Sequence, residues 1–416
     1  MTVITARGRI DALDVLRGVA ILGTFGTNVW LFAEPGGPVA WISTAFVDGD
    51  PVEIALQTLT NGKFLALLTL LFGVGIELQY RSAVRRGSPW PGRYPVRAAI
   101  LLVEGIVHYV LVFEFDVLMG YAIASLLVAY LVGRSDRAVR AWAGAIGAGY
   151  AAALLAITAV LVMTPDGPTS ASASDPSRTA SWPRQVLLRL EYATLFRAEL
   201  LLIVPSAVVL FLVGSRLVRA GAFTEAGARI RRGLMAVGLG VGVPLNALAA
   251  AAGPDWFLVD RYLAPPLVAL GLLGLGTSLV RRARRGAGPI RRGLTAVGRT
   301  ALSCYVLQNV LAAVLCYGWG LGLAATFSGP WFVLALWAGV SALLLAVAPL
   351  WLRHVDRGPL ELLMHRAYGF AGMARIGVGS SSPARSGRHG PRRRGRSASG
   401  QPGSAGGVKV PSSPGR

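Results

Sequence analysis

The chain has 416 residues, of which 54% are hydrophobic and only 15% are charged, and its mean hydropathy is +0.56. Soluble globular proteins usually have about a quarter of their residues charged, so this composition excludes an ordinary soluble domain. The formal net charge of +21 would suit a nucleic-acid-binding protein, but the arginines are confined to short segments between apolar runs and to the C-terminal tail, as in a membrane protein.

Long apolar segments recur along most of the chain. A bilayer core about 30 Å thick is spanned by roughly 20 apolar residues in a helix, and many segments of the chain approach that length. We therefore predict an all-α polytopic membrane bundle with about ten transmembrane helices within residues 1–376. In chain order the apolar segments cover residues 15–32, 64–79, 95–113, 117–132, 139–163, 199–217, 233–252, 262–280, 300–318 and 331–351.

The segments between the predicted spans alternate in charge. Residues 81–97 contain five arginines, whereas residues 34–61 contain neither arginine nor lysine. By the positive-inside rule, both termini are predicted to face the cytoplasm, as in a multi-pass protein of the inner (plasma) membrane. Residues 164–197, with four arginines on the predicted outer side, and Arg261 depart from this pattern. The second half of the longer departure is amphipathic and is expected to lie in the membrane interface.

The C-terminal tail, residues 377–416, is rich in Gly, Ser, Pro and Arg and includes the run GPRRRGR. It has no apolar material to bury, so we predict that it is disordered. Its positive charge favours the anionic lipids of the inner leaflet. Membrane lipids, and not nucleic acid, are therefore the expected partners of the tail.

Charged side chains cluster at the start of the first predicted span, in the stretch RIDALDVLRGVAILGTFGTN. Asp11, Asp14 and Arg17 follow one another at helical spacing and share one face. Either Arg17 reaches the lipid headgroups while Asp14 pairs with it, or the group belongs to a polar pocket that a water-soluble cosubstrate enters from the cytoplasm. Asn28, three turns further along that face, would by itself be explained by a hydrogen bond to a neighbouring helix.

A second polar group lies in the third span and the turn after it, in EGIVHYVLVFEFDVLMGY. His108 is the only histidine within an apolar segment, and Glu104 precedes it by one helical turn. The two could form a structural pair, or the imidazole could act as a general base, because imidazole titrates near working pH. Asp116 lies in the turn to the fourth span, and Tyr121 lies just inside that span.

The second span, within GKFLALLTLLFGVGIE, has polar groups at both ends. Lys63 is expected at its outer mouth, and Glu77 is expected to pair with a cytoplasmic arginine. Gly73 and Gly75 favour close packing against another helix.

The quoted stretches, together with KFLALLTLLFGVGIELQYRS, GRTALSCYVLQNVLAAVLCYGWGLGL and RGPLELLMHRAYG, resemble the YeiB-like family of bacterial membrane proteins from Arg9 to about Phe370. The resemblance implies about ten spans and a C-terminal region of unknown function, about residues 215–376. It also implies a distant relation to transmembrane acyltransferases, which use cytoplasmic acyl-CoA to acylate a substrate on the far side. Those enzymes have a histidine at or shortly beyond the outer end of the first span, but here no histidine lies between Asn28 and Lys63.

The resemblance and the residues together predict a membrane-embedded acyltransferase. His108, Asp116 and Asn28 would be catalytic, Asp14 and Arg17 would bind acyl-CoA as cosubstrate, and the acceptor would be an envelope glycan or a small molecule. Glu104, Tyr121 and Lys63 are further polar groups at membrane depth, each a functional candidate because burial there is costly. No metal site is expected. Two alternatives stay open. The protein could be a transporter or flippase for a polar or lipid-linked molecule, or a descendant of the enzymes without catalytic activity.

Overall fold

A computed structural model describes residues 11–38, 41, 50–164, 179–283 and 288–378 of the chain. The chain divides into two units, Met1–Gly372 and Met373–Arg416, and every side chain discussed below belongs to the first. Most of the tail that is predicted to be disordered, from residue 379 onward, lies outside the described residues.

The described residues form helices joined by turns and loops, with no strand among them, which confirms the all-α prediction. Shorter turns of 3-10 and π helix lie at Pro254–Trp256, Gly238–Gly242 and Val259–Leu263. The α-helices are α1 (Asp11–Ala33), α3 (Pro51–Thr60), α4 (Lys63–Arg85), α5 (Tyr94–Leu111), α6 (Leu118–Val132), α7 (Asp136–Met163), α8 (Trp182–Glu191), α9 (Ala193–Ala198), α10 (Leu200–Arg219), α11 (Ala228–Val237), α12 (Val243–Ala251), α13 (Pro265–Arg282), α14 (Pro289–Arg299), α15 (Ala301–Cys316), α16 (Leu323–Thr326), α17 (Pro330–His354) and α18 (Pro359–Val378).

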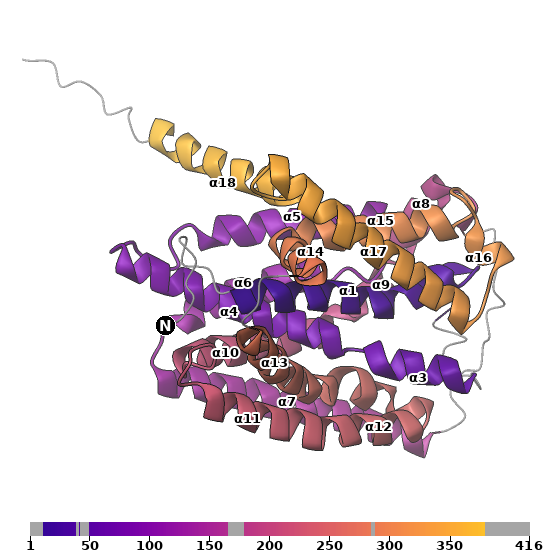
Figure 1. The fold of residues 1–416 in the computed structure, drawn as a ribbon, viewed down its shortest axis with the longest axis horizontal. Helices are drawn as coiled ribbons and strands as arrows, with labels where there is room; N and C mark the ends of the chain where they lie inside the picture. The colour runs from indigo at the N-terminus through magenta and orange to yellow at the C-terminus, as the bar shows by residue number, and fades with distance from the viewer. Residues whose placement is uncertain (1–10, 39–40, 42–49, 165–178, 284–287, 379–416) are drawn as a thin grey trace, which may run out of the picture. The chain divides into compact units, whose positions relative to one another are not determined.

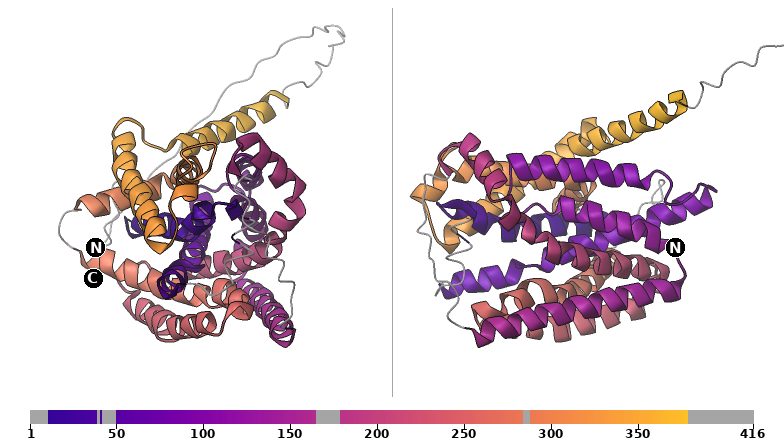
Figure 2. Two further views of the ribbon diagram at one scale, coloured as in Figure 1. Left: turned by 90° about the vertical axis from the view of Figure 1, so that its right-hand side faces the viewer. Right: turned by 180° about the vertical axis from the view of Figure 1, so that it is seen from behind.

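Each apolar segment predicted from the sequence corresponds to helix. In the part of the chain that the structure describes, 8 helices are long and apolar enough to cross a membrane. A ninth span results if α14 and α15, which are bent by 96° at their junction, count as one. The remaining predicted segment is α6, which is shorter, with 15 residues. The protein is thus a multi-pass membrane bundle, whose long helices run alongside one another (Figure 2).

Helix α1 forms the centre of the bundle. It contacts α4, α13, α14, α15 and α17, and Figure 1 shows it between the helices above and below. In its most apolar stretch 83% of the residues are buried inside the protein, against 11% for α7. A helix that is mostly apolar and surrounded by protein belongs to a core. Helix α1 therefore holds its few polar side chains in fixed positions.

Two glycines allow α1 and α14 to meet backbone to backbone. A Cβ added at Gly18 would lie 2.1 Å from the Leu294 carbonyl oxygen, and one at Gly298 would lie 1.8 Å from that of Asp14. Real side chains cannot occupy either position without moving a helix. Gly18, the glycine of LDVLRG, therefore allows the backbone of α14 to lie directly against α1. The sharp bend between α14 and α15 is thereby held next to the first helix.

The glycine pair of α4 divides its roles. A Cβ at Gly73 would lie 2.3 Å from the Phe211 carbonyl oxygen, so this residue serves close packing with α10, as predicted for both glycines. A Cβ at Gly75 would meet nothing within 4 Å. The packing prediction is therefore wrong for Gly75, because that position faces open space.

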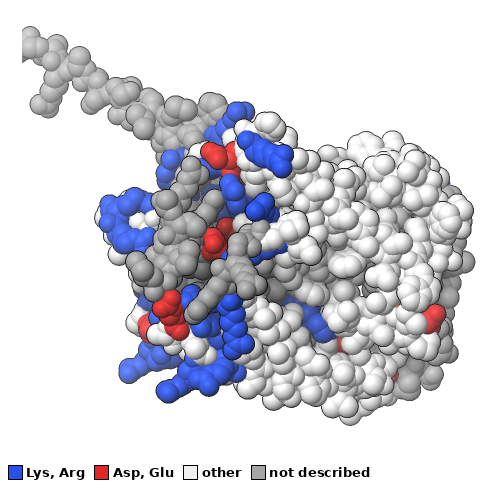
Figure 3. Space-filling view, in the orientation of Figure 1, with Lys and Arg blue, Asp and Glu red and all other residues white. Residues whose placement is uncertain are grey.

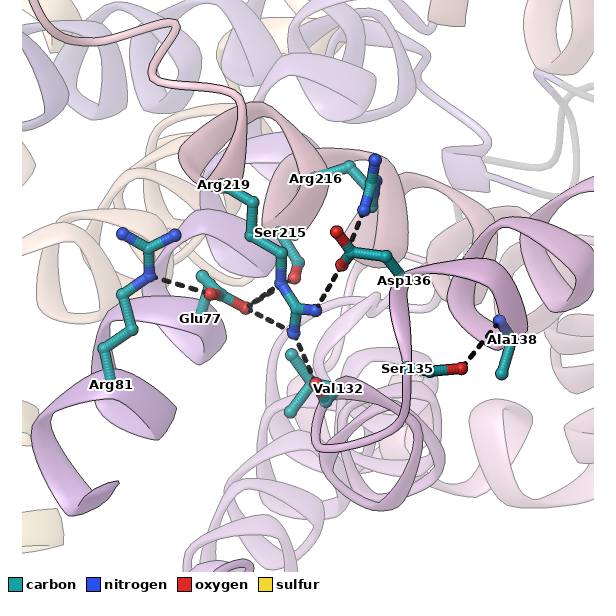
Figure 4. A network of polar contacts seen from close by, with 9 residues as sticks. All are labelled: Glu77, Arg81, Val132, Ser135, Asp136, Ala138, Ser215, Arg216 and Arg219. Atoms are coloured by element: carbon teal, nitrogen blue, oxygen red, sulfur yellow. Dashed lines mark hydrogen bonds and ion pairs between the residues drawn. The ribbon is translucent and has the colours of Figure 1, made fainter.

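Arginines gather at one end of the helices, which we call the arginine-rich end (Figure 3). There the buried Glu77 carboxylate accepts from Arg81 Nε at 2.8 Å, from Ser215 Oγ at 2.7 Å and from Arg219 at 3.1 Å (Figure 4). Arg219 also reaches Asp136 Oδ1 at 2.8 Å. The predicted pairing of Glu77 with an arginine is confirmed, and it ties α4, α7 and α10 together.

Candidate functional site

His108 and Asp116 form a buried pair where α5 turns into α6. His108 lies in the last turn of α5, and its Nδ1 is 2.8 Å from Asp116 Oδ1. The other oxygen of Asp116, Oδ2, accepts from the backbone N–H of Met119 at 3.1 Å and so caps the first turn of α6. The exposed fractions are 3% for His108 and 1% for Asp116. The capping bond fixes the carboxylate, and the carboxylate in turn orients the imidazole.

Two asparagines extend this pair on the other side of the ring. Asn309 Nδ2 is 3.3 Å from His108 Nε2, and Asn309 Oδ1 accepts from Asn28 Nδ2 at 3.3 Å. With the Asn309 amide oriented in this way, its nitrogen donates and Nε2 accepts, so a neutral ring carries its proton on Nδ1 and donates it to Asp116. A polarised chain Asn28–Asn309–His108–Asp116 thus links α1, α15, α5 and α6.

Asn309 was not among the residues singled out from the sequence. It is fully buried and lies in the middle of α15, within the stretch CYVLQNVLAAV. The available signal was an amide side chain inside an apolar span, which is costly unless it is paired. Its neighbour Gln308 is also fully buried, and its side-chain amide has no hydrogen-bond partner.

Glu104 is not the partner of His108. Both of its carboxylate oxygens are buried without a hydrogen-bond partner. The structural pair considered from the sequence is therefore wrong, because the short turn after α5 brings Asp116 to the Nδ1 side of the ring.

The α5–α6 turn is covered by α8, which buries an arginine. Arg189 has an exposed fraction of 1%, and its Nε donates to Glu114 Oε1 at 2.9 Å. Its other nitrogens donate to the carbonyl oxygens of Val110 and Val112, at the end of α5, at 3.2 and 3.0 Å. Free carbonyls at a helix C-terminus favour a cation. Arg189 therefore holds α8 over the turn that contains Asp116.

Two further arginines that depart from the predicted charge alternation are also bound to partners. Arg197 donates to the Asp116 carbonyl oxygen at 3.3 Å, and its guanidinium lies 3.9 Å above the ring of Tyr109. Arg261 pairs with Glu199 at 3.4 Å. These charges stabilise local structure, so they carry little weight as topology signals.

A cavity of about 320 Å³ lies beside the polar chain. Charged and polar side chains line it toward the arginine-rich end: Arg17, Gln79, Arg97, Arg299 and Glu361. We call this the basic mouth. At the other end, the closed end, the walls include Leu68, Leu118 and Tyr121.

The closed end adjoins the His108–Asp116 pair. Val117, which directly follows Asp116, and Tyr305 both line the cavity. The ring of Tyr305 is 5.2 Å from that of His108, measured between centroids. His108 therefore lies one aromatic ring away from the cavity.

Arg17 lies at the basic mouth with its predicted partner. Its guanidinium is 3.1 Å from Asp14 Oδ1, and the two side chains are 28% and 14% exposed. The ion pair expected from the helical spacing is present, and Arg17 contributes to the wall of a cavity at the same time.

Lys63 lies apart from these groups, at the end of α4 opposite the arginine-rich end. Its ammonium donates to the Thr58 carbonyl oxygen. Close by in the fold, the Asp260 carboxylate accepts from Asn61 at 2.6 Å and from Asn246 at 2.7 Å. These bonds join the break between α3 and α4 to the π turn before α13, so Lys63 belongs to a separate polar cluster.

The structure thus brings Asn28, His108 and Asp116 into one chain, and puts Arg17 and Tyr121 at opposite ends of one cavity. Glu104 and Lys63 join neither set. Within the described ranges, no three His, Cys, Asp or Glu side chains come together as a metal site would need.

The chain is similar to two curated bacterial proteins over most of its length. It is 28% identical over 388 residues to the uncharacterized protein YeiB of Escherichia coli (strain K12), a match covering 84% of this chain and 94% of that protein. It is 24% identical over 393 residues to the uncharacterized protein YxaH of Bacillus subtilis (strain 168), covering 86% and 94%. No solved structure matches. Residues 217–370 match the family described as "Protein of unknown function (DUF418)". The chain is thus a multi-pass membrane protein that is similar to YeiB and YxaH over most of its length and matches the DUF418 family in its C-terminal half.

Proposed function

We propose that this protein is a membrane-embedded acyltransferase, which moves an acyl group from cytoplasmic acyl-CoA to an acceptor at the opposite face of the bacterial inner membrane. One observation carries the proposal: a buried carboxylate–imidazole pair lies one aromatic ring from the closed end of a cavity whose mouth is basic. A thioester at that closed end would lie one aromatic ring from His108.

In this proposal His108 is the general base. An acceptor hydroxyl or amine replaces Asn309 as the hydrogen-bond donor to Nε2 and gives up its proton there as it attacks the thioester carbon. The C–S bond then breaks, and the leaving thiolate takes the proton back from the imidazolium. Asp116 stabilises the imidazolium, as the carboxylate does in other acid–base pairs. The amide of Asn28 offers a donor for the transient oxyanion.

The basic mouth would receive the phosphates of the donor. Arg17, Arg97 and Arg299 present guanidinium groups there, and guanidinium binds phosphate through paired hydrogen bonds. Asp14 would fix the orientation of Arg17. An envelope glycan or a small molecule would be the acceptor.

The purified protein in proteoliposomes tests the proposal directly. We expect it to bind acyl-CoA and, with a suitable acceptor extract, to release free CoA thiol. If the parent protein neither binds nor consumes acyl-CoA, the proposed acyltransferase activity is wrong.

Transport of a polar or lipid-linked molecule is the second candidate, and a specific feature favours it. Tyr121 lines both the large cavity and a small one of about 30 Å³, whose wall also includes Arg261 and Tyr262. Polar groups therefore lie on both sides of Tyr121, as a path across the membrane would require. Uptake of candidate substrates without acyl-CoA consumption would favour this alternative.

The proposed direction of transfer requires the arginine-rich end to face the cytoplasm, as the positive-inside rule predicts. Ser88 and Ser328 form a matched pair for this test, because both are exposed and lie in loops at opposite ends of the helices. The native cysteines, Cys304 and Cys316, are buried. We expect Ser328→Cys to react with a membrane-impermeant thiol reagent in intact spheroplasts, and Ser88→Cys to react only after lysis. The opposite labelling pattern would reverse the topology.

A further inference from the structure

The cavity follows one face of α4 for three turns. Leu68, Leu71, Phe72, Gly75 and Gln79 all line it, and their spacing puts them on a single stripe of the helix. Eleven residues separate the two ends of the stripe, which corresponds to about 16 Å of helix. The cavity is therefore elongated along α4, with its charged groups confined to one end.

The basic mouth is suited to an anionic head group. Arg97 is joined to Gln79 by a hydrogen bond of 3.1 Å, which places it at the same end of the stripe. The Arg299 Nε is buried without a hydrogen-bond partner, although its NH2 group donates to the Asp356 carbonyl oxygen at 3.2 Å. Glu361 is the acidic member, and its carboxylate accepts from the backbone N–H groups of Leu302 and Ser303 at 2.8 and 3.3 Å. Since Glu361 is occupied in capping α15, the arginines determine what the mouth attracts.

Gly75 sets the width of the cavity. It lies in the middle of the stripe, and an added Cβ would meet no atom within 4 Å. Glycine costs a helix interior roughly 0.5 to 1 kcal/mol relative to alanine. Here no neighbouring helix requires the absence of a side chain, in contrast to Gly73, and a larger side chain at this position would extend into the cavity.

Tyr121 sets the depth of the cavity. Its hydroxyl pairs with that of Thr69 and donates to the Leu65 carbonyl oxygen at 3.3 Å, so the ring is held across the closed end. Beyond the ring lies the cavity of about 30 Å³, which has room for about one water molecule. Among the described residues that line the two cavities, Tyr121 alone is shared.

We infer that the cavity is the binding tunnel for the extended thioester arm of the acyl donor, that Gly75 keeps it open, and that Tyr121 limits the size of the acyl group. The inference rests on the proposed function. An arm that begins at phosphate and ends in a thioester matches a basic mouth, an elongated apolar shaft and a closed end one aromatic ring from His108. Tyr121 leaves little space past the thioester, so short acyl groups are accepted and long ones are not.

Equilibrium binding of acetyl-, butyryl- and octanoyl-CoA to the purified protein tests the depth. We expect the parent to bind octanoyl-CoA at least about tenfold more weakly than acetyl-CoA. Tyr121→Ala joins the two cavities and should reverse this order, because each buried methylene adds up to about fourfold in affinity. Tyr121→Phe keeps the ring and should retain the parent's order. Equal affinities for all three donors in the parent, or an unchanged order in Tyr121→Ala, would contradict the inference.

Gly75→Leu tests the width, with Gly149→Leu as the matched control. Gly149 also lies within a long apolar helix, α7, is exposed, and has nothing within 4 Å of an added Cβ. We expect Gly75→Leu to weaken binding of every acyl-CoA, and of CoA itself, at least about tenfold, while the protein inserts and elutes normally. Gly149→Leu should bind like the parent. Equal binding by the two variants would exclude the tunnel.

The binding assay separates this inference from the proposed function. If the donors bind in the expected order and Gly75→Leu blocks them, but no acyl group is transferred, the tunnel stands and the reaction is wrong. If acyl groups are transferred, but Tyr121→Ala keeps the parent's order of binding and Gly75→Leu binds the donors like the parent, the reaction stands and the tunnel is wrong. Competition by a lysophospholipid stronger than that by CoA would assign the cavity to a lipid and also overturn the inference.

Discussion

Replacing His108 with alanine is expected to lower acyl transfer by about 10² to 10⁴, the usual contribution of a general base, while acyl-CoA still binds. Binding should survive because the basic mouth is formed by other residues, among them Arg17 and Arg97, and the cavity wall does not include His108. Transfer should fail because His108 has the only basic nitrogen among the four hydrogen-bonded side chains Asn28, Asn309, His108 and Asp116.

Two companion variants separate chemistry from folding. His108→Asn retains an N–H donor for the Asp116 carboxylate but has no basic nitrogen, so it should be as inactive as His108→Ala and better folded. His365→Ala, at an exposed position on α18, is the matched control and should transfer like the parent. The measurements are thiol release and acyl-CoA binding in the same proteoliposomes. Normal transfer by a correctly inserted His108→Asn would show that the polar chain is structural.

Replacing Arg219 with alanine is expected to destabilise the protein by about 3 kcal/mol, near the lower limit for breaking a buried ion pair. The change leaves the Glu77 carboxylate, which is 1% exposed, with only Arg81 and Ser215 as partners (Figure 4). It also removes one of the two contacts from α10 to Asp136 at the start of α7, and leaves that of Arg216.

Arg216→Ala is the control for this prediction. Arg216 pairs with Asp136 at 2.6 Å, but the Asp136 side chain is 55% exposed, and such surface pairs contribute roughly 0 to 1 kcal/mol. Thermal unfolding in detergent, followed by size-exclusion recovery after heating, should rank the proteins parent, Arg216→Ala and Arg219→Ala. Equal recovery of the two variants would mean that Glu77 is stabilised mainly by Arg81.

The candidate site shows which side-chain contacts can be predicted from residue spacing alone. Spacing along one helix correctly predicts the pair of Asp14 with Arg17, because residues three apart on a helix always share a face. Spacing also suggests Glu104 as the neighbour of His108, and there it is wrong. The partner, Asp116, comes from beyond the end of the helix, and only the path of the turn brings it to the ring.

The sequence by itself determined that this is an all-α membrane bundle, where its apolar helices lie along the chain, and that one end of them is rich in arginine. Hydropathy and loop charge are local quantities, summed over about 20 consecutive residues, so no tertiary information is needed for them. The tertiary structure decided which polar groups meet. Asn28 and Asn309 are 281 positions apart, and their hydrogen bond depends on the packing of α1 against α15. The same holds for Gly73 and Gly75, two residues apart on one helix: one faces the backbone of α10 and the other an open cavity, because the packing of the neighbouring helices determines what each position meets.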